Sequence, residues 1–503
     1  MSQCCYALLP SRGDFMISGD TTMIDLLLAS PLGSIAVISV VVLIVTCLYR
    51  VTVHPLSHIP GPLIPKITSL WLYYHAYIGD EATAIHELHN KYGPLIRVAP
   101  NEVDIADVDA VSPIYVSKGG FRKAPCYVNF DIDLHRSIFS ALDPEQRSPR
   151  AKAVIPLFST KSIRDNEAAI YGCVDTMVGR MQDESGSGKP VNVLNLTRSL
   201  ALDAVSTHLF RENYNGISEK GEQLSASAFV DLFVGVGRFF YLPNVVFTWT
   251  EWAIGKLYPS ERTTSSLAVV DKFVDDMVTH TKAGAQTYPG RLLAIGLTPS
   301  EVKAQCKDLM FAGTDSTGAN LARICQELAR SPDRYQALRS EVVSNLEAGT
   351  AKTDAQALPY LSAVVKEALR ISMANPTRLP RIVPSSGWTF KGTNFPSGAI
   401  VGCSAYELHL NPAVFPNPQT FQPERWLRDN VTPEMRKHSF AFGAGSRACI
   451  ARNLATTELY LATEKLAESG VLRGARPCKD SIEIYEWFNS RVKDEKVELV
   501  WGV

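Results

Sequence analysis

The sequence predicts a mainly α-helical protein that also contains small β-sheets, an α+β fold. Beyond residue 70, apolar residues recur mostly at the spacing of helices. Strand-like stretches are short and lie near residues 94–106, 387–401 and 481–500. With 503 residues, of which 46% are hydrophobic and 20% charged, the chain is long enough to bury a large core. No internal repeat that would indicate a solenoid is found in the sequence.

The N-terminal part predicts a membrane anchor. Residues 32–49 carry no charge, and a helix of about this length can span a bilayer. A buried core helix would have a similar composition, but this run lies near the chain end and a polar, Pro-rich stretch follows it. Arg50 and Lys66 follow the run, so the positive-inside rule makes residues 1–31 a short lumenal N-terminus. No small-residue cleavage site follows, which disfavours a secretory signal.

Residues 50–66 predict a hinge between this anchor and the rest of the chain. Prolines at positions 55, 60, 62 and 65 fix φ and bias the preceding residues toward extended conformations. Such a segment acts as a semi-rigid spacer. Residues 67–503 are then expected to form the globular domain.

Charge and cysteine content exclude several classes of protein. The formal net charge of −1 argues against nucleic acid as a general partner. The ten cysteines show neither C-x-x-C spacing nor the spacing of zinc ligands, so neither a zinc site nor a disulfide framework is predicted. Most of them are expected to be buried in a reducing compartment.

The stretch HSFAFGAGSRACIARNLA, residues 438–455, fits two kinds of site. Gly443 to Ala448 matches the G-x-G-x-x-G/A pattern of dinucleotide-binding proteins. That pattern requires further parallel strands, yet only about fifty residues follow Ala448 and they contain a turn-rich loop. The alternative is a loop that presents Cys449 at the start of a helix from Ile450 to about Leu466.

The second interpretation explains more of the residues. A helix N-terminus lowers the pKa of a cysteine and favours its thiolate. Glycines at 443 and 445 allow a tight turn, and the small Ala451 lets a flat ligand lie close. Arg447 is placed to hold an anionic edge of that ligand. We therefore expect the loop to present Cys449 as a thiolate to that ligand.

These residues resemble a known family. Phe442-x-x-Gly445-x-Arg447-x-Cys449-x-Ala451 matches the haem-binding signature F-x-x-G-x-R-x-C-x-G of cytochrome P-450 proteins, with alanine in the last position. Three further motifs of this family follow the expected order: Glu367-x-x-Arg370, Phe421-Gln-Pro-Glu-Arg425-Trp426, and Ala312-Gly313-Thr-Asp315-Ser316-Thr317. The anchor with HPLSHIPGPL and then KYGPLIRVAPNEVDI is similar to the opening of fungal microsomal members. The resemblance runs from about residue 30 to the C-terminus.

The resemblance implies the cytochrome P-450 fold, a single haem domain behind the N-terminal transmembrane helix, with haem b bound through the Cys449 thiolate. Phe442, Gly445 and Arg447 then belong to the haem-binding loop. Glu367, Arg370 and Arg425 are expected to form a buried charged triad. For the haem propionates, Arg381 is the first choice in NPTRLPRIVP, with Arg378 as runner-up. The arginine of the family's C-helix corresponds best to Arg150, although Gln146 stands where an aromatic residue is usual.

The central helix carries the expected catalytic residues. Thr298-Pro-Ser-Glu301 predicts a capping box at its start. Ser316 and Thr317 can bond back to the carbonyls of Ala312 and Gly313 and loosen that turn. Asp315 next to Ser316 provides an acid beside a hydroxyl, which suits a proton relay, and Thr317 is the alternative hydroxyl. Most members carry threonine where Ser316 stands.

The activity implied by the resemblance is monooxygenation of a small hydrophobic substrate by O₂, as in fungal secondary metabolism. Electrons are expected from NADPH through a separate NADPH-cytochrome reductase in the endoplasmic reticulum membrane, with the catalytic domain in the cytosol. Residues 226–249 are rich in aromatic and aliphatic side chains and predict a lid at the bilayer or ordinary core. A basic docking face is suggested by Arg147, Arg150, Lys152, Arg436, Lys437 and Arg452. Two other functions remain open: a haem-thiolate isomerase or dehydratase, and a haem-binding protein without catalysis.

Overall fold

The computed structural model describes residues 31–502 apart from 222–223, 258–260 and 350–353. The chain divides into two compact units, Met1–Ser57 and His58–Val503. In the described part of the first unit, the helix α2 (Pro31–Thr52) contains the predicted span 32–49. It is the one helix in the described residues that is long and apolar enough to cross a membrane. The Ser39 hydroxyl donates to the carbonyl of Ile35 at 2.8 Å, which satisfies a polar group within this apolar helix.

The predicted hinge 50–66 is more structured than its prolines indicate. Helix α2 continues through Thr52, and α3 (Leu63–Ile67) already begins within the segment. The boundary between the two units falls inside it, after Ser57. Its action as a hinge stays a prediction.

One end of the second unit contains the largest sheet together with several helices. Its largest sheet has the order β1-β2-β8-β5-β3, and helices α4 (Leu70–Ile78) and α5 (Glu81–Tyr92) accompany it. The five strands are β1 (Leu95–Ala99), β2 (Glu102–Ile105), β3 (Arg122–Lys123), β5 (Arg381–Ile382) and β8 (Ile400–Gly402). The other strands are β4 (Val191–Asn192), β6 (Trp388–Phe390), β7 (Thr393–Phe395), β9 (Ala475–Pro477), β10 (Ile484–Tyr485), β11 (Arg491–Val492) and β12 (Glu498–Trp501). Each of the three predicted strand regions is confirmed.

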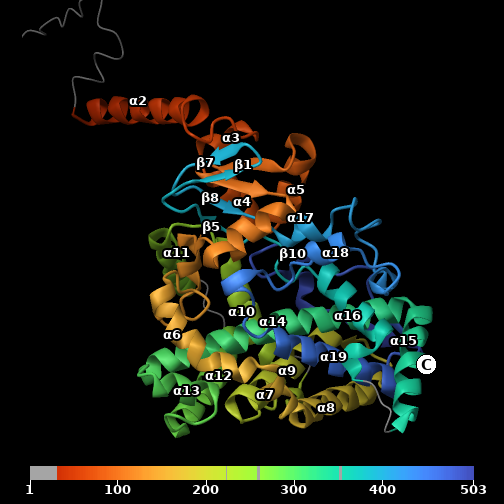
Figure 1. Ribbon diagram of the computed structural model, residues 1–503. Helices are drawn as coiled ribbons and strands as arrows, with labels where there is room; N and C mark the ends of the chain where they lie inside the picture. Colours follow the sequence, from red (N-terminus) through yellow and green to blue (C-terminus); the bar gives the residue numbers. More distant parts are fainter. Residues whose placement is uncertain (1–30, 222–223, 258–260, 350–353, 503) are drawn as a thin grey trace, which may run out of the picture. The chain divides into compact units, whose positions relative to one another are not determined.

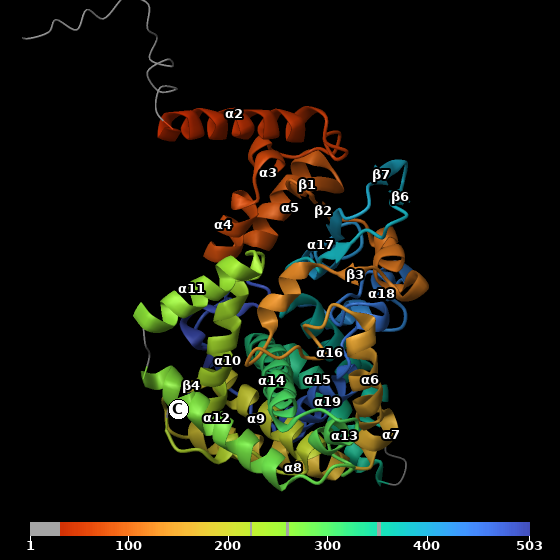
Figure 2. The same ribbon diagram turned by 90° about the vertical axis from the view of Figure 1, so that its left-hand side faces the viewer.

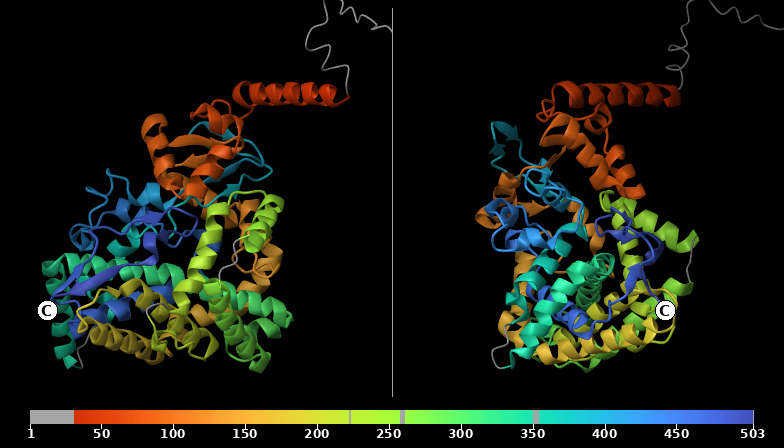
Figure 3. Two further views of the ribbon diagram at one scale, coloured as in Figure 1. Left: turned by 180° about the vertical axis from the view of Figure 1, so that it is seen from behind. Right: turned by 90° about the vertical axis from the view of Figure 1, so that its right-hand side faces the viewer.

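Helices form the other end of the second unit, as the two views in Figure 3 show. In Figures 1 and 2 the long helix α14 lies in the middle of this helical part. The remaining helices of the described chain, of which α11, α17 and α18 lie nearer the sheet (Figure 1), are α6 (Pro144–Val154), α7 (Thr160–Arg164), α8 (Glu167–Ser185), α9 (Val193–Val205), α10 (Ser225–Val236), α11 (Asn244–Leu257), α12 (Glu261–His280), α13 (Tyr288–Ala294), α14 (Pro299–Arg330), α15 (Pro332–Glu347), α16 (Pro359–Ile371), α17 (Ala405–His409), α18 (Pro433–Lys437) and α19 (Arg452–Ser469).

Helix α14 begins as the sequence predicts and packs closely on α9. Thr298 and Glu301 form the predicted capping box. A Cβ at Gly313 would lie 2.7 Å from Cγ2 of Val205, and a Cβ at Gly318 would lie 2.6 Å from Cγ of Arg198. These glycines cost helix stability, but they let the fully buried α9 approach α14.

A buried network around Glu367 joins α16 to the loop that follows α17. The guanidinium of Arg370 donates to both carboxylate oxygens of Glu367, at 2.8 and 2.9 Å. Arg425 Nε donates to the same carboxylate at 3.0 Å, Trp426 Nε1 at 2.8 Å and the N–H of Gln422 at 2.9 Å. The exposed fractions of Glu367, Arg370 and Arg425 are 0, 2 and 7%. The predicted buried triad is confirmed, and Trp426 and Gln422 extend it.

The same network reaches the loop before α19 through His409. Arg370 Nη1 donates to the carbonyl of His409 at 3.0 Å. The N–H of Phe440 donates to His409 Nε2 at 2.9 Å, so Nδ1 carries the ring proton and donates to the carbonyl of Arg370 at 3.0 Å. Burial and the nearby Arg370 charge lower the pKa of His409 to about 3, which keeps the ring neutral.

We predict that Glu367→Ala lowers the free energy of unfolding by about 3–5 kcal/mol, because it leaves two buried arginines without their shared carboxylate. Denaturant unfolding of the detergent-solubilised protein measures this change. Lys479→Ala is the control, since it breaks a fully exposed ion pair with Asp494 and should hardly change stability. Equal effects of the two substitutions would contradict the structural role of the network.

Candidate functional site

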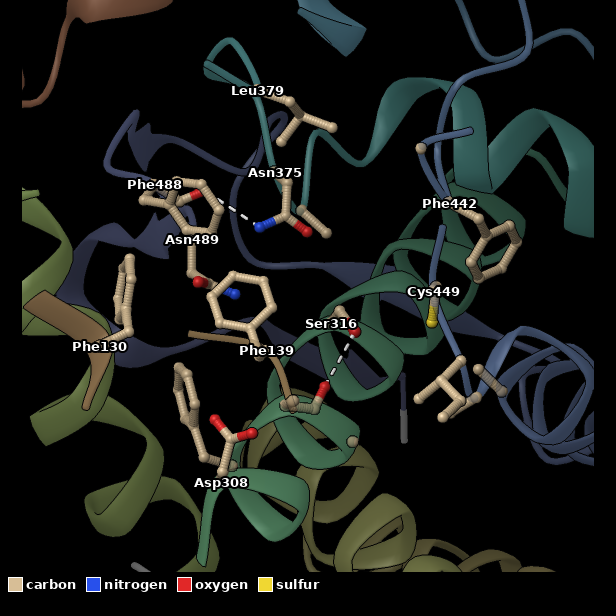
Figure 4. Close-up of a pocket in the computed structure, with 18 of the residues that line it drawn as sticks. Phe130, Phe139, Asp308, Ser316, Asn375, Leu379, Phe442, Cys449, Phe488 and Asn489 are labelled. Atoms are coloured by element: carbon tan, nitrogen blue, oxygen red, sulfur yellow. Dashed lines mark hydrogen bonds between the residues drawn. The ribbon is translucent and has the colours of Figure 1, made fainter. Parts of the chain in front are cut away.

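A cavity of about 320 Å³ lies inside the second unit. Its walls come from the middle of α14, the loop before α19, the segment after α16 and the chain around β3 (Figure 4). Much of the lining is aromatic, including Phe130, Phe139, Phe233, Phe311 and Phe488. A cavity that is mostly apolar but has a few polar groups is typical of a small-molecule site.

The loop before α19 presents Cys449 to this cavity. Gly443 and Gly445 have φ values of 63° and 70°, and a Cβ at Gly445 would lie 1.8 Å from the carbonyl oxygen of Tyr115. A side chain at Gly445 is therefore excluded. The N–H of Cys449 donates to the carbonyl of Phe442 at 2.9 Å and closes the loop. Figure 4 shows the sulfur of Cys449 across the cavity from Ser316.

The electrostatic environment of Cys449 differs from the expectation. Helix α19 begins at Arg452, three residues after the cysteine, so Cys449 is not in its first turn. The cysteine keeps accessible surface because it faces the cavity, although protein surrounds it. Burial raises the pKa of its thiol, and the N–H of Ala451 and the charge of Arg452 oppose this only in part. The predicted lowering of the pKa is therefore wrong for the protein alone, whereas a bound metal cation would favour the thiolate.

Four cationic side chains, Lys123, Arg147, Arg381 and Arg447, line the same cavity. The register of β3 and β5 places Lys123 directly opposite Arg381. Lys123 Nζ donates to the carbonyl of Phe139 at 2.6 Å, and Arg381 Nη1 donates to the Tyr127 hydroxyl at 3.1 Å. Within the described residues, none of the four forms an ion pair. Like charges on paired strands destabilise a sheet, so this arrangement calls for an anion.

Arg447 also lacks an acidic partner among the described residues. Its Nη2 donates to the carbonyl of Leu142 at 3.2 Å, while Nη1 is buried and has no hydrogen-bond partner in the described part of the chain. Burial and repulsion by Arg147 and Arg381 lower the pKa of Arg447 to about 10. Burial and the same kind of repulsion hold the pKa of Lys123 well below its usual value. A flat ligand with two carboxylates, as haem has, fits this cluster.

The structure corrects the choice of arginine on α6. Arg150 does not line the cavity, because its Nη2 donates to Glu301 at 2.8 Å and its Nη1 to the carbonyl of Arg136 at 2.5 Å. Arg147, three residues earlier on the same helix, lines the cavity instead. Between the two arginines considered after α16, Arg381 lines the cavity, whereas Arg378 is paired with Glu102 away from it.

Helix α14 contributes Gly313, Ser316 and Thr317 to the cavity wall. The Ser316 hydroxyl donates to the carbonyl of Ala312 at 3.3 Å, as predicted (Figure 4). The equivalent bond from Thr317 to Gly313 is not formed among the described residues, and α14 continues through this turn without a break. The hydroxyls of Ser316 and Thr317 are thus the polar groups that α14 offers at this level of the cavity.

Asp315 points away from the cavity, although it precedes Ser316 in the sequence. Successive residues on a helix are about 100° apart, so one faces the cavity and the other faces α9. Arg198 Nη2 donates to Asp315 at 3.0 Å, and Arg198 Nη1 donates to Asp231 at 2.9 Å. Burial raises the pKa of Asp315 to about 6, and the Arg198 charge opposes this. The direct relay from Asp315 to Ser316 that adjacency suggested is not formed.

Asn489 provides an indirect link. It lines the cavity, and its Nδ2 donates to Asp315 at 3.4 Å. The sequence contains no motif around Asn489, and the same holds for Lys123, which lies in a strand of two residues. Phe442 lines the cavity, while Gly445 shapes the loop, and their contact with haem stays a prediction.

Comparisons with known proteins agree with this geometry. The profile of the family described as cytochrome P450 matches residues 60–468. The chain is 38% identical to the cytochrome P450 monooxygenase mfmF of Annulohypoxylon moriforme, over 92% of this chain and 98% of that protein. It is 30% identical to the fusicoccadiene C-8 hydroxylase of Alternaria brassicicola, over 82% of this chain and 84% of the relative. It is also 30% identical to the cytochrome P450 monooxygenase tazI of Aspergillus terreus, over 85% and 89%.

We predict that Arg147→Ala weakens haem binding about tenfold or more, because it removes a charged hydrogen-bond donor from the cavity. Transfer of haem to an excess of apomyoglobin measures the loss. Arg150→Ala is the matched control on the same helix and should retain haem like the unaltered protein. The reverse order of the two variants would restore Arg150 as the cofactor contact.

Proposed function

Because the chain belongs to the cytochrome P450 family, we propose that it inserts one oxygen atom of O₂ into a small lipophilic molecule in fungal secondary metabolism. The chain is a cytochrome P450 monooxygenase, since the family profile covers most of it and its relatives carry that name. Members of this family hold haem through a cysteine thiolate and use O₂. The substrate, the roles of individual residues and the electron donor are the finer parts of the proposal.

One observation carries the proposal: a single cavity is lined by the thiol of Cys449, by four cations that form no ion pair with the described residues, and by Ser316 and Thr317. Cys449 would bind the iron through its thiolate. Lys123, Arg147, Arg381 and Arg447 would hold the two carboxylates of the haem. When bound, haem supplies the redox chemistry that activates O₂, and thiolate ligation favours cleavage of the O–O bond.

In this proposal, side chains on α14 donate and supply protons. The Ser316 hydroxyl can release its bond to the carbonyl of Ala312 and donate a proton into the cavity. Asp315 can supply protons only after its bonds to Arg198 change, or through Asn489 and water at the cavity wall. With a pKa of about 6, the Asp315 carboxyl is suited to exchange protons near neutral pH.

Residues 226–249, expected to be a lid or core, divide between these two roles. Helix α10 packs into the core through Phe229, Val230 and Val234. Helix α11 instead exposes Val245, Val246, Trp249 and Trp252. Tryptophans and aliphatic residues exposed together are typical of a surface that contacts a bilayer. We assign α11 to membrane contact and to the entry of a lipophilic substrate.

The electron donor in this proposal is a separate NADPH-dependent reductase in the endoplasmic reticulum membrane, where α2 would anchor the enzyme as a single-pass protein with its catalytic domain in the cytosol.

The docking face for this reductase contains fewer than the six basic residues that the sequence suggests. Arg147 lines the cavity, Arg150 is paired with Glu301, and Lys437 with Asp109. Lys152, Arg436 and Arg452 are exposed and form no ion pair with the described residues. These three form the docking face that we propose.

The proposal predicts that Cys449→Ser abolishes the red-shifted Soret band of the ferrous carbon monoxide complex, because that band requires a thiolate ligand. Absorption spectra of the purified protein test this. Cys478→Ser alters an exposed cysteine outside the cavity and should leave the band intact. An unchanged band in the Cys449→Ser protein would contradict the assignment of Cys449 as the thiolate ligand. Consumption of NADPH and O₂ with the reductase then separates a monooxygenase from an isomerase or a haem carrier.

We further predict that Ser316→Ala keeps haem and substrate binding but uncouples turnover, with hydrogen peroxide released as NADPH is consumed. General acid–base groups contribute about 10² to 10⁴ in rate, and a substituting water reduces this loss. Ser316→Thr keeps the hydroxyl with a stiffer side chain and should retain coupling. The measurement is product formed per NADPH in these variants and in Thr317→Ala. Uncoupling by Thr317→Ala alone would transfer the role to Thr317.

A further inference from the structure

Asp308 places a carboxyl group in the aromatic part of the cavity. It lies on α14 in the series Asp308, Ala312 and Ser316, all of which line the cavity. Residues four apart follow one ridge of a helix, and eight residues span about 12 Å along its axis. Figure 4 shows the Asp308 carboxyl on the same side of the cavity as Phe139 and Phe130. This chain therefore has a polar group at a fixed distance from the hydroxyl of Ser316.

Nearby cations form no ion pair with Asp308 in the described chain. Lys307 contacts the carboxylates of Asp133 and Asp271, the latter at 3.0 Å. Lys123 attracts Asp308 electrostatically but donates its hydrogen bond to the carbonyl of Phe139. Within the described residues, Asp308 forms no ion pair, and its carboxyl accepts a hydrogen bond from the Ser137 hydroxyl. One hydroxyl leaves most of the hydrogen-bonding capacity of a carboxylate unused.

Two other acids line the cavity, but neither is held in the same way. Asp131 is paired with Arg136 at 2.8 Å. Glu251 comes from α11 and remains exposed. Asp308 is thus the acid of the cavity that combines an enclosed position with the absence of an ion pair among the described residues. Burial raises the pKa of its carboxyl to about 7, and the Ser137 hydroxyl and the charge of Lys123 oppose this only in part.

Aromatic rings surround the space next to this carboxyl. Phe130 and Phe139 have ring centroids 5.7 Å apart, and Phe139 and Phe488 are 5.9 Å apart. Phe233 stacks on Phe311 at 5.1 Å. Such walls bury an apolar chain, and their faces also attract cations. An unpaired carboxyl in this environment is costly unless a ligand supplies a hydrogen-bond donor.

We propose that Asp308 binds the polar head of the substrate, an ammonium or hydroxyl group, while the apolar chain of the substrate extends along α14 toward Ser316. This inference rests on the proposed function and names the substrate class: amphiphiles with a hydrogen-bond donor about 12 Å from the oxidised carbon. Plain hydrocarbons lack the group that satisfies Asp308. Asp308 is then the residue that determines which end of the substrate enters the reaction.

Three probes of equal chain length test the proposal: decane, 1-decanol and N,N-dimethyldecylamine, which is protonated at neutral pH. The tertiary amine is chosen because its crowded nitrogen is a poor ligand for iron. Isothermal titration calorimetry of the haem-loaded protein gives each dissociation constant. The variants are Asp308→Asn and Asp308→Leu, with Asp275→Asn as a control that removes an exposed carboxylate outside the cavity. Comparison of each variant with the unaltered protein cancels the intrinsic hydration of each probe.

Asp308→Leu should weaken binding of the preferred polar probe about 10- to 100-fold and leave decane unchanged or tighter, the size expected for one charged hydrogen bond. The Asp308→Asn variant distinguishes a hydroxyl head group from an ammonium head group. Its amide oxygen still accepts from a hydroxyl, so 1-decanol keeps its affinity, whereas the amine loses its counter-charge and binds about 10- to 100-fold more weakly. Asp275→Asn should leave all three values unchanged.

Equal effects of Asp308→Leu on decane, 1-decanol and the amine would overturn the proposal. If the leucine variant does not fold, Asp308→Ala replaces it in the same comparison. The carbon monoxide spectrum separates this failure from that of the proposed function. A protein that shows the thiolate band but no dependence on Asp308 refutes only the substrate class. An unaltered protein without the band refutes the function on which the inference rests.

Discussion

The rest of the site depends on the hydrogen bonds that the buried carboxylate of Glu367 accepts. It accepts hydrogen bonds from Arg370, Arg425, Trp426 and the N–H of Gln422, all inside the protein. Since a buried carboxylate and two buried guanidinium groups are each costly alone, they stabilise the fold only when all are present. Arg370 then holds His409, and His409 holds the N–H of Phe440 in the loop before α19. The position of Cys449 thus rests on a charge network that lies outside the cavity.

In the cavity, by contrast, the positive charges are not paired with negative ones in the described chain. Around Glu367, positive and negative groups meet one another, whereas Lys123, Arg147, Arg381 and Arg447 face a common space without an acid bonded to any of them in the described chain. The pairing of β3 with β5 even sets Lys123 against Arg381. A fold keeps such strain where a bound anion removes it. The carboxylates of haem meet that requirement, so the cluster is an observation from the protein itself in favour of the cofactor.

Sequence reasoning recovered the parts of this molecule that local patterns encode. The apolar helix α2, the three strand regions, the capping box of α14, the buried triad and the cavity-lining residues Cys449, Ser316 and Arg381 all follow from spacing or from motifs. It missed Lys123 and Asn489 because each owes its position to chain segments far away in the sequence. Arg150 was chosen because the arginine of the family's C-helix corresponds best to it. Arg147 lies three residues earlier on α6, and only tertiary packing decides which of the two faces the cavity. The predicted lowering of the pKa of the Cys449 thiol was wrong. Local helix geometry was expected to outweigh burial, but burial has the larger effect.

Helix α14 explains why adjacency in a motif does not guarantee a shared role. Gly313 serves two purposes, since it lines the cavity and also makes room for Val205 of α9. Asp315 lies on the side that meets α9, where Arg198 holds it, while Ser316 faces the cavity one residue later. Any proton that passes from Asp315 to Ser316 must therefore go around the helix, through Asn489 or water, or wait until the Arg198 contact opens. Because Arg198 also binds Asp231 on α10, the position of α10 and the freedom of Asp315 are physically coupled. A displacement of α10 would therefore change the contact of Asp231 with Arg198 and, through Arg198, the environment of Asp315.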